Sequence, residues 1–288
     1  MRKRGQIMTN IKIVTDSSAG LTEDEIKRYD ITIVPLSVMI DGTIYVERET
    51  ITNEQFPELM KNAKSLPKTS QPPIGKFVDV FDRLGEDGSE VLCLTMMESI
   101  SGTVHAAEQA AAITKTKVTV VDSKETDRCL AFQVIEAAKM IEANAQMDAI
   151  LEKLEDIREH SEIYLAVVNL NNLVAGGRIS KMAGALSNLL NIKVMLEVTD
   201  GEIKIRLKGR GLKPIHKYLD DVYEKMQSGV RKVKAIGISH VQADEEVAKM
   251  KATLEKLFPD IKIVVRETVP IIATHTGMGA FCLLYYTE

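Results

Sequence analysis

Short apolar runs alternate with helical patterns in the first half of the chain. Residues 103–114 are rich in alanine, the residue with the highest helix propensity, and lie between two such runs. Each run holds four or five mostly apolar residues bounded by polar or glycine-containing segments, which is typical of a buried strand. Strands that alternate with helices predict parallel βαβ units. The predicted strands of this half cover residues 11–15, 31–34, 91–94 and 118–121.

Two Asp-Gly pairs, one in each half of the chain, lie between apolar runs and predict β-hairpins. This pair suits the tight turn that joins two antiparallel strands, because both of its residues tolerate a left-handed backbone. The pairs and their flanking runs are Asp41-Gly42 between residues 38–40 and 44–46, and Asp200-Gly201 between residues 192–198 and 203–207.

A pair of helices is predicted near the middle of the chain and supplies the candidate domain connection. Apolar residues in the stretch 128–146 recur at helical spacing on one face. Asp148 is placed to cap a second helix, which ends near His160. We therefore expect an N-terminal α/β domain over residues 8–160 and a C-terminal α/β domain over residues 161–288.

The second half continues the mixture of strands and helices, with no internal repeat. Pro214 is placed to begin a helix and Gly229 to end it, since proline fits a first helical turn and glycine commonly follows the last. Pro259 stops a later helix that extends to Leu257. Besides the second hairpin, strands are predicted at residues 163–168, 233–238, 261–265 and 280–286.

Composition describes an ordinary soluble protein with few aromatic rings. The chain has 288 residues, which at roughly 150 residues per domain indicates two domains. Apolar residues make up 45% and charged residues 27%, which excludes disorder, collagen and coiled coil as overall classes. With 13 methionines, no tryptophan, 6 phenylalanines and 7 tyrosines, the interior must be built mainly from aliphatic side chains and methionine.

Net charge, apolar run lengths and cysteine spacing argue against nucleic acid or a membrane as partners and against disulfides. The net charge of −4 gives no electrostatic reason to expect nucleic acid or an anionic membrane as a general partner. The one dense basic cluster, Arg2-Lys3-Arg4, precedes Met8, so we interpret residues 1–7 as a disordered stub or the remnant of an upstream start. No apolar run approaches the roughly 18 residues that span a bilayer. Three widely spaced cysteines without a CxxC motif argue against disulfides and fit a cytoplasmic protein: Cys93, Cys129 and Cys282.

Familiar catalytic motifs are missing from the sequence. There is no GxxxxGK[ST] phosphate loop, no HExxH zinc motif, no GxSxG nucleophile elbow and no complete GxGxxG dinucleotide motif. Because the chain has 5 histidines and no ligand-like cluster, we expect neither a metal site nor a cofactor.

Four polar segments follow predicted strands or apolar runs, where ligands of α/β proteins commonly bind. Each also has an ordinary structural explanation: a side-chain turn, a stiff loop before proline, a helix cap or a solvated histidine. Ser-Gly-Thr at the start of the alanine-rich helix suits an anion. Ser101 and His275 could instead pair as nucleophile and base, which their spacing cannot decide. The segments are residues 15–18, 68–73, 98–103 and 274–279.

Taken together, these segments resemble the DegV family, in particular the fatty-acid-binding subunit (FakB) of bacterial fatty acid kinase. The resemblance keeps a consistent order over almost the whole chain. The sequence departs from the family at Gly20, Met278 and His105, where aspartate, proline and a more serine-rich stretch are usual. The segments that carry it are Thr15-Asp16-Ser17-Ser18, Thr69-Ser70-Gln71-Pro72, Ser101-Gly102-Thr103, Asp122-Ser123, Gly176-Gly177-Arg178-Ile179-Ser180, Leu190-Asn191-Ile192-Lys193 and His275-Thr276-Gly277.

The resemblance implies a two-domain α/β fold of the DegV type (EDD fold). The N-terminal domain would hold a Rossmann-like parallel sheet, and the C-terminal domain a mixed sheet. One long-chain fatty acid would lie in a buried tunnel between them, and aliphatic and methionine side chains suit the wall of such a tunnel. The residues implied in carboxylate binding are Thr69, Ser101 and His275, supported by the loop residues Ser70, Gly102 and Thr103.

The resemblance also implies partners. Members of this group do not bind ATP themselves: a separate ATP-binding kinase subunit phosphorylates the bound acid, and an acceptor enzyme passes the acyl phosphate to phospholipid synthesis. The chain would then be a non-enzymatic, cytoplasmic, bacterial lipid-binding subunit, a monomer with transient kinase and membrane contacts. Arg178 and Arg210 both lie beside glycines. They are either solvated arginines in turns, or they present positive charge at the tunnel mouth to an acyl phosphate or to the kinase partner.

Two other functions stay open at this point. One is a serine hydrolase of lipids or small esters that uses Ser101 as nucleophile and His275 as base. The other is a protein that binds a phosphorylated metabolite at the Ser-Gly-Thr helix start. The missing nucleophile elbow counts against the first, and the missing phosphate loop counts against a nucleotide as the ligand of the second.

Overall fold

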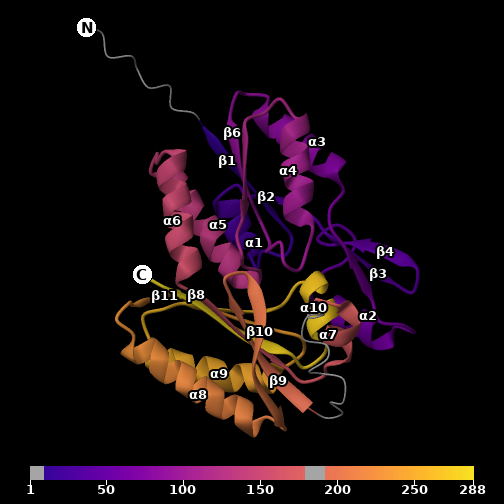
Figure 1. Cartoon of the computed structure of the whole chain (residues 1–288), viewed down its shortest axis with the longest axis vertical. Coiled ribbons are helices and arrows are strands. Elements are labelled where there is room, and N and C mark those ends of the chain that lie inside the picture. The colour runs from indigo at the N-terminus through magenta and orange to yellow at the C-terminus, as the bar shows by residue number, and fades with distance from the viewer. Residues whose placement is uncertain (1–9, 179–191) are drawn as a thin grey trace.

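The computed structural model describes residues 10–178 and 192–288 of the chain. Figure 1 shows two β-sheets, one in the upper and one in the lower half of the view, with helices packed around each. The expected N-terminal stub lies outside the described residues, as do Ser180 and Asn191 of two segments that carry the family resemblance.

Four parallel strands form the N-terminal sheet, as the alternation of strands and helices predicts. Its elements are β1 Ile11–Asp16, α1 Glu23–Arg28, β2 Thr32–Val34, α3 Ile74–Gly85, β6 Glu90–Thr95, α4 Thr103–Ile113 and β7 Val118–Asp122. The strand order is β2-β1-β6-β7. Phe77 and Phe81 of α3 pack with Ala106 and Ala110 of α4 over one face of the sheet. Parallel pairing requires such crossover helices.

A small antiparallel sheet projects beside the N-terminal sheet, at the right of Figure 1. Its elements are β3 Ser37–Ile40, β4 Thr43–Val46, α2 Phe56–Asn62 and β5 Lys68–Ser70. The first predicted hairpin is confirmed, because Asp41 (φ 47°) and Gly42 (φ 85°) both adopt the left-handed backbone of its turn. Strand β5 lies where the sequence predicted a stiff loop. It pairs with β3 so that Val38 lies opposite Thr69.

Six strands form a mixed C-terminal sheet in which β11 and β12 are parallel and the other neighbouring pairs are antiparallel. The elements are β8 Ser161–Val167, β9 Ile192–Thr199, β10 Glu202–Arg210, α8 Lys213–Ser228, β11 Val233–His240, α9 Asp244–Leu257, β12 Ile263–Glu267 and β13 Phe281–Thr287. The strand order is β10-β9-β8-β13-β11-β12, so the last strand of the chain lies near the centre of the sheet. Helix α8 contains Pro214 in its first turn and is followed by Gly229, as predicted.

Helix α5 (Asp127–Glu142) packs between the two sheets and is buried on opposite faces. Leu130 and Val134 join the apolar core of the N-terminal sheet. Cys129 and Phe132 join the core formed with β8 and β13 of the C-terminal sheet. One helix therefore belongs to the core of both halves.

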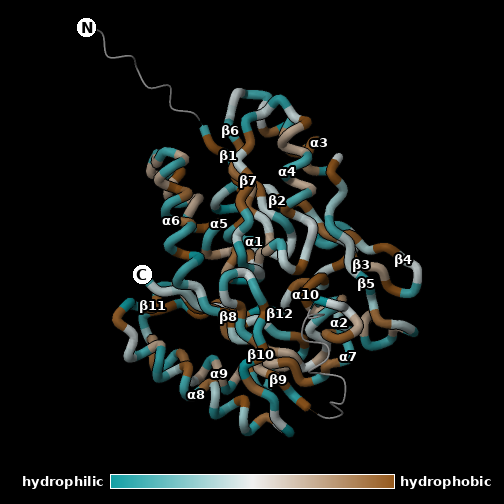
Figure 2. Tube along the Cα trace, in the orientation of Figure 1, coloured by the Kyte–Doolittle hydropathy of each residue, from teal (hydrophilic) through white to brown (hydrophobic). Residues whose placement is uncertain are grey.

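Helix α6 (Met147–Glu159) packs against α5 and is amphipathic. Figure 2 shows teal and brown residues alternating along it. The predicted cap at Asp148 is wrong, because the N-cap residue is Gln146 and Asp148 lies inside the first turn. There its negative charge interacts favourably with the positive end of the helix dipole. No helix in residues 10–178 and 192–288 is long and apolar enough to cross a membrane. The three cysteines are buried and free.

Two short helices lie where the sequence predicted turns or loops. Helix α7 (Asn171–Gly176) ends at Gly177, whose φ of 72° suits glycine. Helix α10 (Pro270–Thr276) has proline in its first turn and contains His275 in its last. Although α10 follows the C-terminal strand β12, it packs against α2, α7, β3 and β5. The end of the sequence thus contributes to the N-terminal side of the molecule.

A buried carboxyl group connects the two sheets at the start of α5. Asp127 accepts hydrogen bonds from Ser239 of β11 (2.9 Å) and from Thr268 after β12 (2.7 Å). Its backbone carbonyl accepts a bond from the Gly20 N–H in the loop after β1 (3.0 Å). Because Asp127 and its donors are buried, water cannot take the place of a lost donor unless the surrounding residues rearrange.

We predict that Thr268→Val lowers the free energy of unfolding by about 1–3 kcal/mol, because an isosteric side chain leaves one buried oxygen of Asp127 without its donor. Chemical denaturation measures the change. The matched control is Thr253→Val on α9, whose hydroxyl makes an exposed bond to the Lys249 carbonyl. The control should change stability by no more than about 0.5 kcal/mol. Equal losses in the two variants would contradict the assigned role of Asp127.

Candidate functional site

A cavity lies between the loops of the N-terminal sheet and helix α10 on one side and the strands β8, β9 and β10 on the other. No aromatic side chain is among the described residues that line it. This wall agrees with a composition rich in aliphatic residues and methionine and poor in rings. Its apolar side chains are Leu36, Met96, Met97, Ile100, Ile163, Leu165, Leu173, Leu196, Val198, Ile203, Ile271 and Ile272.

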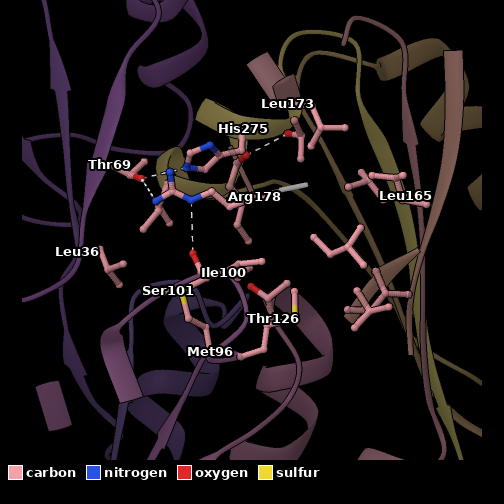
Figure 3. Close-up of a pocket in the computed structure, with 18 of the residues that line it drawn as sticks. Leu36, Thr69, Met96, Ile100, Ser101, Thr126, Leu165, Leu173, Arg178 and His275 are labelled. Atoms are coloured by element: carbon pink, nitrogen blue, oxygen red, sulfur yellow. Dashed lines mark hydrogen bonds between the residues drawn. The ribbon is translucent and has the colours of Figure 1, made fainter. Parts of the chain in front are cut away.

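A cluster of polar groups lies on one side of this cavity. The Thr69 hydroxyl oxygen of β5 lies 2.9 Å from Nε2 of His275 on α10. Arg178, just after α7, donates a hydrogen bond to the same Thr69 oxygen (3.3 Å). Figure 3 shows these three side chains together, with Leu165 across the cavity from them. We call Thr69, Ser101, Arg178 and His275 the head-group cluster, since all four line the cavity.

His275 is neutral at physiological pH. Burial and the neighbouring Arg178 charge lower its pKa to about 4. Its second ring nitrogen, Nδ1, is buried and has no hydrogen-bond partner in the described part of the chain. A Cβ atom on Gly176 would lie 2.3 Å from this nitrogen, so the end of α7 approaches the ring closely because residue 176 is glycine.

Ser101 lies at the start of α4, as the Ser-Gly-Thr segment predicts. Its hydroxyl lies 2.8 Å from the Thr103 hydroxyl and accepts a weak bond from the Thr103 N–H (3.3 Å). Gly102 faces Gln71, whose side-chain oxygen would lie 2.2 Å from an added Cβ. The structure pairs Ser101 with Thr103 and His275 with Thr69. It does not hydrogen-bond Ser101 to His275 as a nucleophile to its base.

An open depression at the surface adjoins the cavity, and Arg178, Thr69, Ser70 and Ser101 line both. The Arg178 guanidinium donates to the carbonyls of Gly176 (2.7 Å) and Ile100 (3.4 Å), besides Thr69. These bonds hold its positive charge at the boundary between the apolar interior and solvent. A group held by the head-group cluster therefore lies beside an opening to the surface.

Arg210 does not line the cavity or the depression. It is the last residue of β10 and is exposed. Ile203, which does line the cavity, lies seven residues earlier on the same strand. At roughly 3.3 Å per residue this distance is about 23 Å, so Arg210 lies at the end of β10 that is remote from the cavity. The role of Arg210 in phosphate or partner contact stays a prediction.

The sequence analysis missed buried carboxyl groups near the site. Glu47, directly after β4, is 1% exposed, and burial raises its pKa to about 8. Asp16, at the end of β1, is fully buried, and burial also raises its pKa. A single glutamate at the end of a strand carries no local signal of burial. Asp16 belongs to the Thr-Asp-Ser-Ser segment, for which a side-chain turn was predicted, and its bond from the Ser18 N–H (2.8 Å) is that turn.

One group of possible metal ligands occurs in the described ranges, although the sequence predicted none. His240, Asp244 and Glu267 offer ligand atoms within 4.8 Å of one another. They lie at the ends of β11 and β12 and the start of α9, and none lines the main cavity. The N–H groups of Gln242 and Ala243 already donate to Glu267 and His240. The group is not part of the head-group cluster.

Comparison with known proteins shows similarity over the whole described chain. The family model described as "Uncharacterised protein, DegV family" matches residues 10–288. A DegV domain-containing protein of Streptococcus pneumoniae serotype 4 is 45% identical over 277 residues, which are 96% of this chain and 98% of that protein.

Two solved structures have the same two-domain fold. A fatty-acid-binding DegV family protein from Thermus thermophilus matches with a TM-score of 0.87 and 29% identity, covering 97% of this chain and 100% of that one. DegV, a fatty acid binding protein from Bacillus subtilis, matches with a TM-score of 0.87 and 27% identity over the same shares. The predicted α/β architecture, with a parallel N-terminal and a mixed C-terminal sheet, is confirmed. The chain belongs to the DegV family.

Proposed function

We propose that this protein binds one long-chain fatty acid in the cavity and holds the carboxylate at the head-group cluster. The observation that supports this most directly is the wall itself: an aliphatic cavity with hydroxyls, an arginine and a histidine gathered on one side. A ligand with a long apolar body and one polar end matches that division. Similar DegV structures described as fatty-acid-binding support the same ligand class.

The apolar chain supplies most of the affinity in this proposal. A 16-carbon acid has about 14 methylenes, and each contributes up to about 0.8 kcal/mol on burial, about 11 kcal/mol as an upper limit. A hydrogen bond to a carboxylate contributes about 1.5–3 kcal/mol, and desolvation of the carboxylate offsets part of it. The head-group cluster therefore determines mainly which end of the ligand lies at the surface.

The head-group residues have separate roles in this proposal. The hydroxyls of Thr69 and Ser101 donate hydrogen bonds to the carboxylate oxygens. Arg178 supplies the compensating positive charge, since His275 is neutral at pH 7. His275 orients the Thr69 hydroxyl through its Nε2 contact. Ser70, Gly102 and Thr103 are the supporting loop residues, at the end of β5 and the start of α4.

We further propose that the bound acid is phosphorylated by a separate ATP-binding kinase subunit. The γ-phosphoryl group would pass to a carboxylate oxygen, giving an acyl phosphate and ADP, and an acceptor enzyme would use the acyl phosphate in phospholipid synthesis. The depression beside Arg178 gives another protein access to the carboxylate. The sequence has no phosphate loop of its own, which fits a non-enzymatic subunit. A cytoplasmic location with transient membrane contact for lipid exchange completes the proposal.

The hydrolase alternative has less support. Nucleophilic catalysis needs the serine within reach of its base, at about 2.6–3.2 Å. Ser101 instead bonds to Thr103, and the His275 nitrogen nearest a hydroxyl contacts Thr69. Turnover of an ester substrate by the purified protein would restore this alternative.

We predict that denaturing extraction and mass spectrometry of the purified protein yields one fatty acid per chain. Ser101→Ala and Thr69→Ala should retain part of this lipid, because the chain supplies most of the affinity, but should impair acyl-phosphate formation about tenfold to a hundredfold. Ser228→Ala, at the exposed end of α8, is the control. Unchanged acyl-phosphate formation in both variants would contradict the assignment of the carboxylate site.

Gly176→Ala should weaken fatty acid binding about tenfold, because the new methyl group would collide with Nδ1 of His275 and displace the ring from Thr69. A titration of delipidated protein with a fluorescent fatty acid measures the change. Gly75→Ala in the first turn of α3 is the matched control, since an added Cβ there meets no atom within 4 Å. Equal affinities in the two variants would show that the position of His275 is unimportant.

Removal of the lipid should lower thermal stability, because it leaves the apolar cavity without its ligand. A ligand at a hundred times its Kd adds about 2.7 kcal/mol to the stability of the folded state. Calorimetry before and after delipidation, and again after re-addition of a long-chain fatty acid, measures this effect. A melting temperature that changes neither on delipidation nor on re-addition of the fatty acid would argue against a ligand in this cavity.

A further inference from the structure

The segment Thr15-Asp16-Ser17-Ser18 has no part in the function proposed so far. It spans the end of β1 and the loop that follows, is almost fully buried, and does not line the cavity. Two of its side chains, together with Glu47, nevertheless make hydrogen bonds to the segments that carry the head-group residues. We call Asp16, Ser17 and Glu47 the buried node.

The first connection leads to Ser101. Asp16 accepts a hydrogen bond from the Met96 N–H (2.7 Å), at the end of β6. Met96 lines the cavity itself, and the chain runs from it through a short loop to Ser101 and α4. Asp16 therefore holds the residue from which the Ser101 loop departs.

The second connection leads to Thr69. The Ser17 hydroxyl accepts a bond from the Leu36 N–H (2.9 Å), directly before β3. Strand β3 pairs with β5, in which Val38 lies opposite Thr69. A shift of β3 relative to β1 would move Thr69 with it, because the two strands share backbone hydrogen bonds.

The third connection leads to His275. The Ser17 hydroxyl donates a hydrogen bond to Glu47, and the other Glu47 oxygen accepts the Ile271 N–H (2.6 Å). Ile271 is in the first turn of α10, and His275 lies four residues later on the same face of this helix. Glu47 thereby holds the start of the helix that carries the histidine.

We propose that the buried node positions the head-group cluster, holding Ser101, Thr69 and His275 at one mutual geometry. The three residues come from segments that are far apart in sequence and have no common strand or helix. Each of them is joined to the node by a buried hydrogen bond at the segment that carries it. Asp16, Ser17 and Glu47 are positioning residues, because none of them lines the cavity. This inference rests on the proposed binding of a carboxylate at the cluster.

The test compares hexadecanoic acid with 1-hexadecanol, which has the same chain and no carboxylate. Both compete with a fluorescent fatty acid for the delipidated full-length protein. The ratio of the two affinities measures recognition of the carboxylate, and the affinity for the alcohol measures the apolar cavity. Ser17→Ala removes the bonds to Leu36 and Glu47, and Glu47→Leu removes the bonds to Ser17 and Ile271. We expect each of them, and Ser101→Ala as well, to lower the ratio about tenfold, with alcohol affinity unchanged within about twofold.

Two controls separate positioning from stability. Glu47→Gln keeps an oxygen for the Ile271 N–H, and its amide group can donate to the Ser17 oxygen in place of the bond that Ser17 donates to Glu47, so it should keep the wild-type ratio. Ser89→Ala removes a serine hydroxyl that is also buried but lies away from the cavity lining, and should leave both affinities unchanged. Because Ser17 acts partly through His275, Ser17→Ala combined with His275→Ala should lower the ratio by less than the two single effects multiplied.

Three results would overturn the inference, and they differ from one another. Full discrimination in Ser17→Ala and Glu47→Leu, with loss in Thr69→Ala and Ser101→Ala, would show that the node does not position the cluster. Equal losses for acid and alcohol would show a general effect on the cavity. Full discrimination in Thr69→Ala, Ser101→Ala and His275→Ala would instead contradict the carboxylate site, and with it any need to position one.

Discussion

The double burial of α5 is the packing constraint on which the rest of the structure depends. One face of the helix completes the core of the parallel sheet, and the opposite face completes the core of the mixed sheet. Neither sheet can cover its inner face with apolar side chains if the helix is removed. The buried bonds of Asp127 to Ser239 and Thr268 then give the two sheets a defined mutual placement at the first turn of this helix.

The cavity lies where this shared packing stops. Thr126 lines it, and from Asp127 onward the helix is buried between the sheets. Before that point the N-terminal loops and α10 face β8, β9 and β10 across the cavity. Protein interiors are normally packed as densely as organic crystals, so an aliphatic cavity at this place departs from ordinary packing, and the proposed ligand binding depends on it.

Local patterns predict most strands, both hairpins and the long helices other than α3, because each depends on neighbouring residues alone. They do not predict β5, whose partner β3 is nearly thirty residues away, or α10, where two threonines and a histidine resemble a loop. The contact between Thr69 and His275 joins residues 206 positions apart, and the spacing of residues along helices and strands cannot predict a contact over such a separation. The family resemblance brought Thr69, Ser101 and His275 together. The burial of Glu47 could not be predicted from the sequence, since it depends on contacts with two distant segments.

The place of β13 in the mixed sheet has a consequence for biosynthesis. This strand follows every other strand of the sheet along the chain, yet it lies between β8 and β11. While the ribosome still holds β13, the parallel sheet can fold but the mixed sheet lacks an inner strand. The cavity wall formed by β8 to β10 then has no support on one side. This wall is therefore completed only after β13 has left the ribosome and paired with β8.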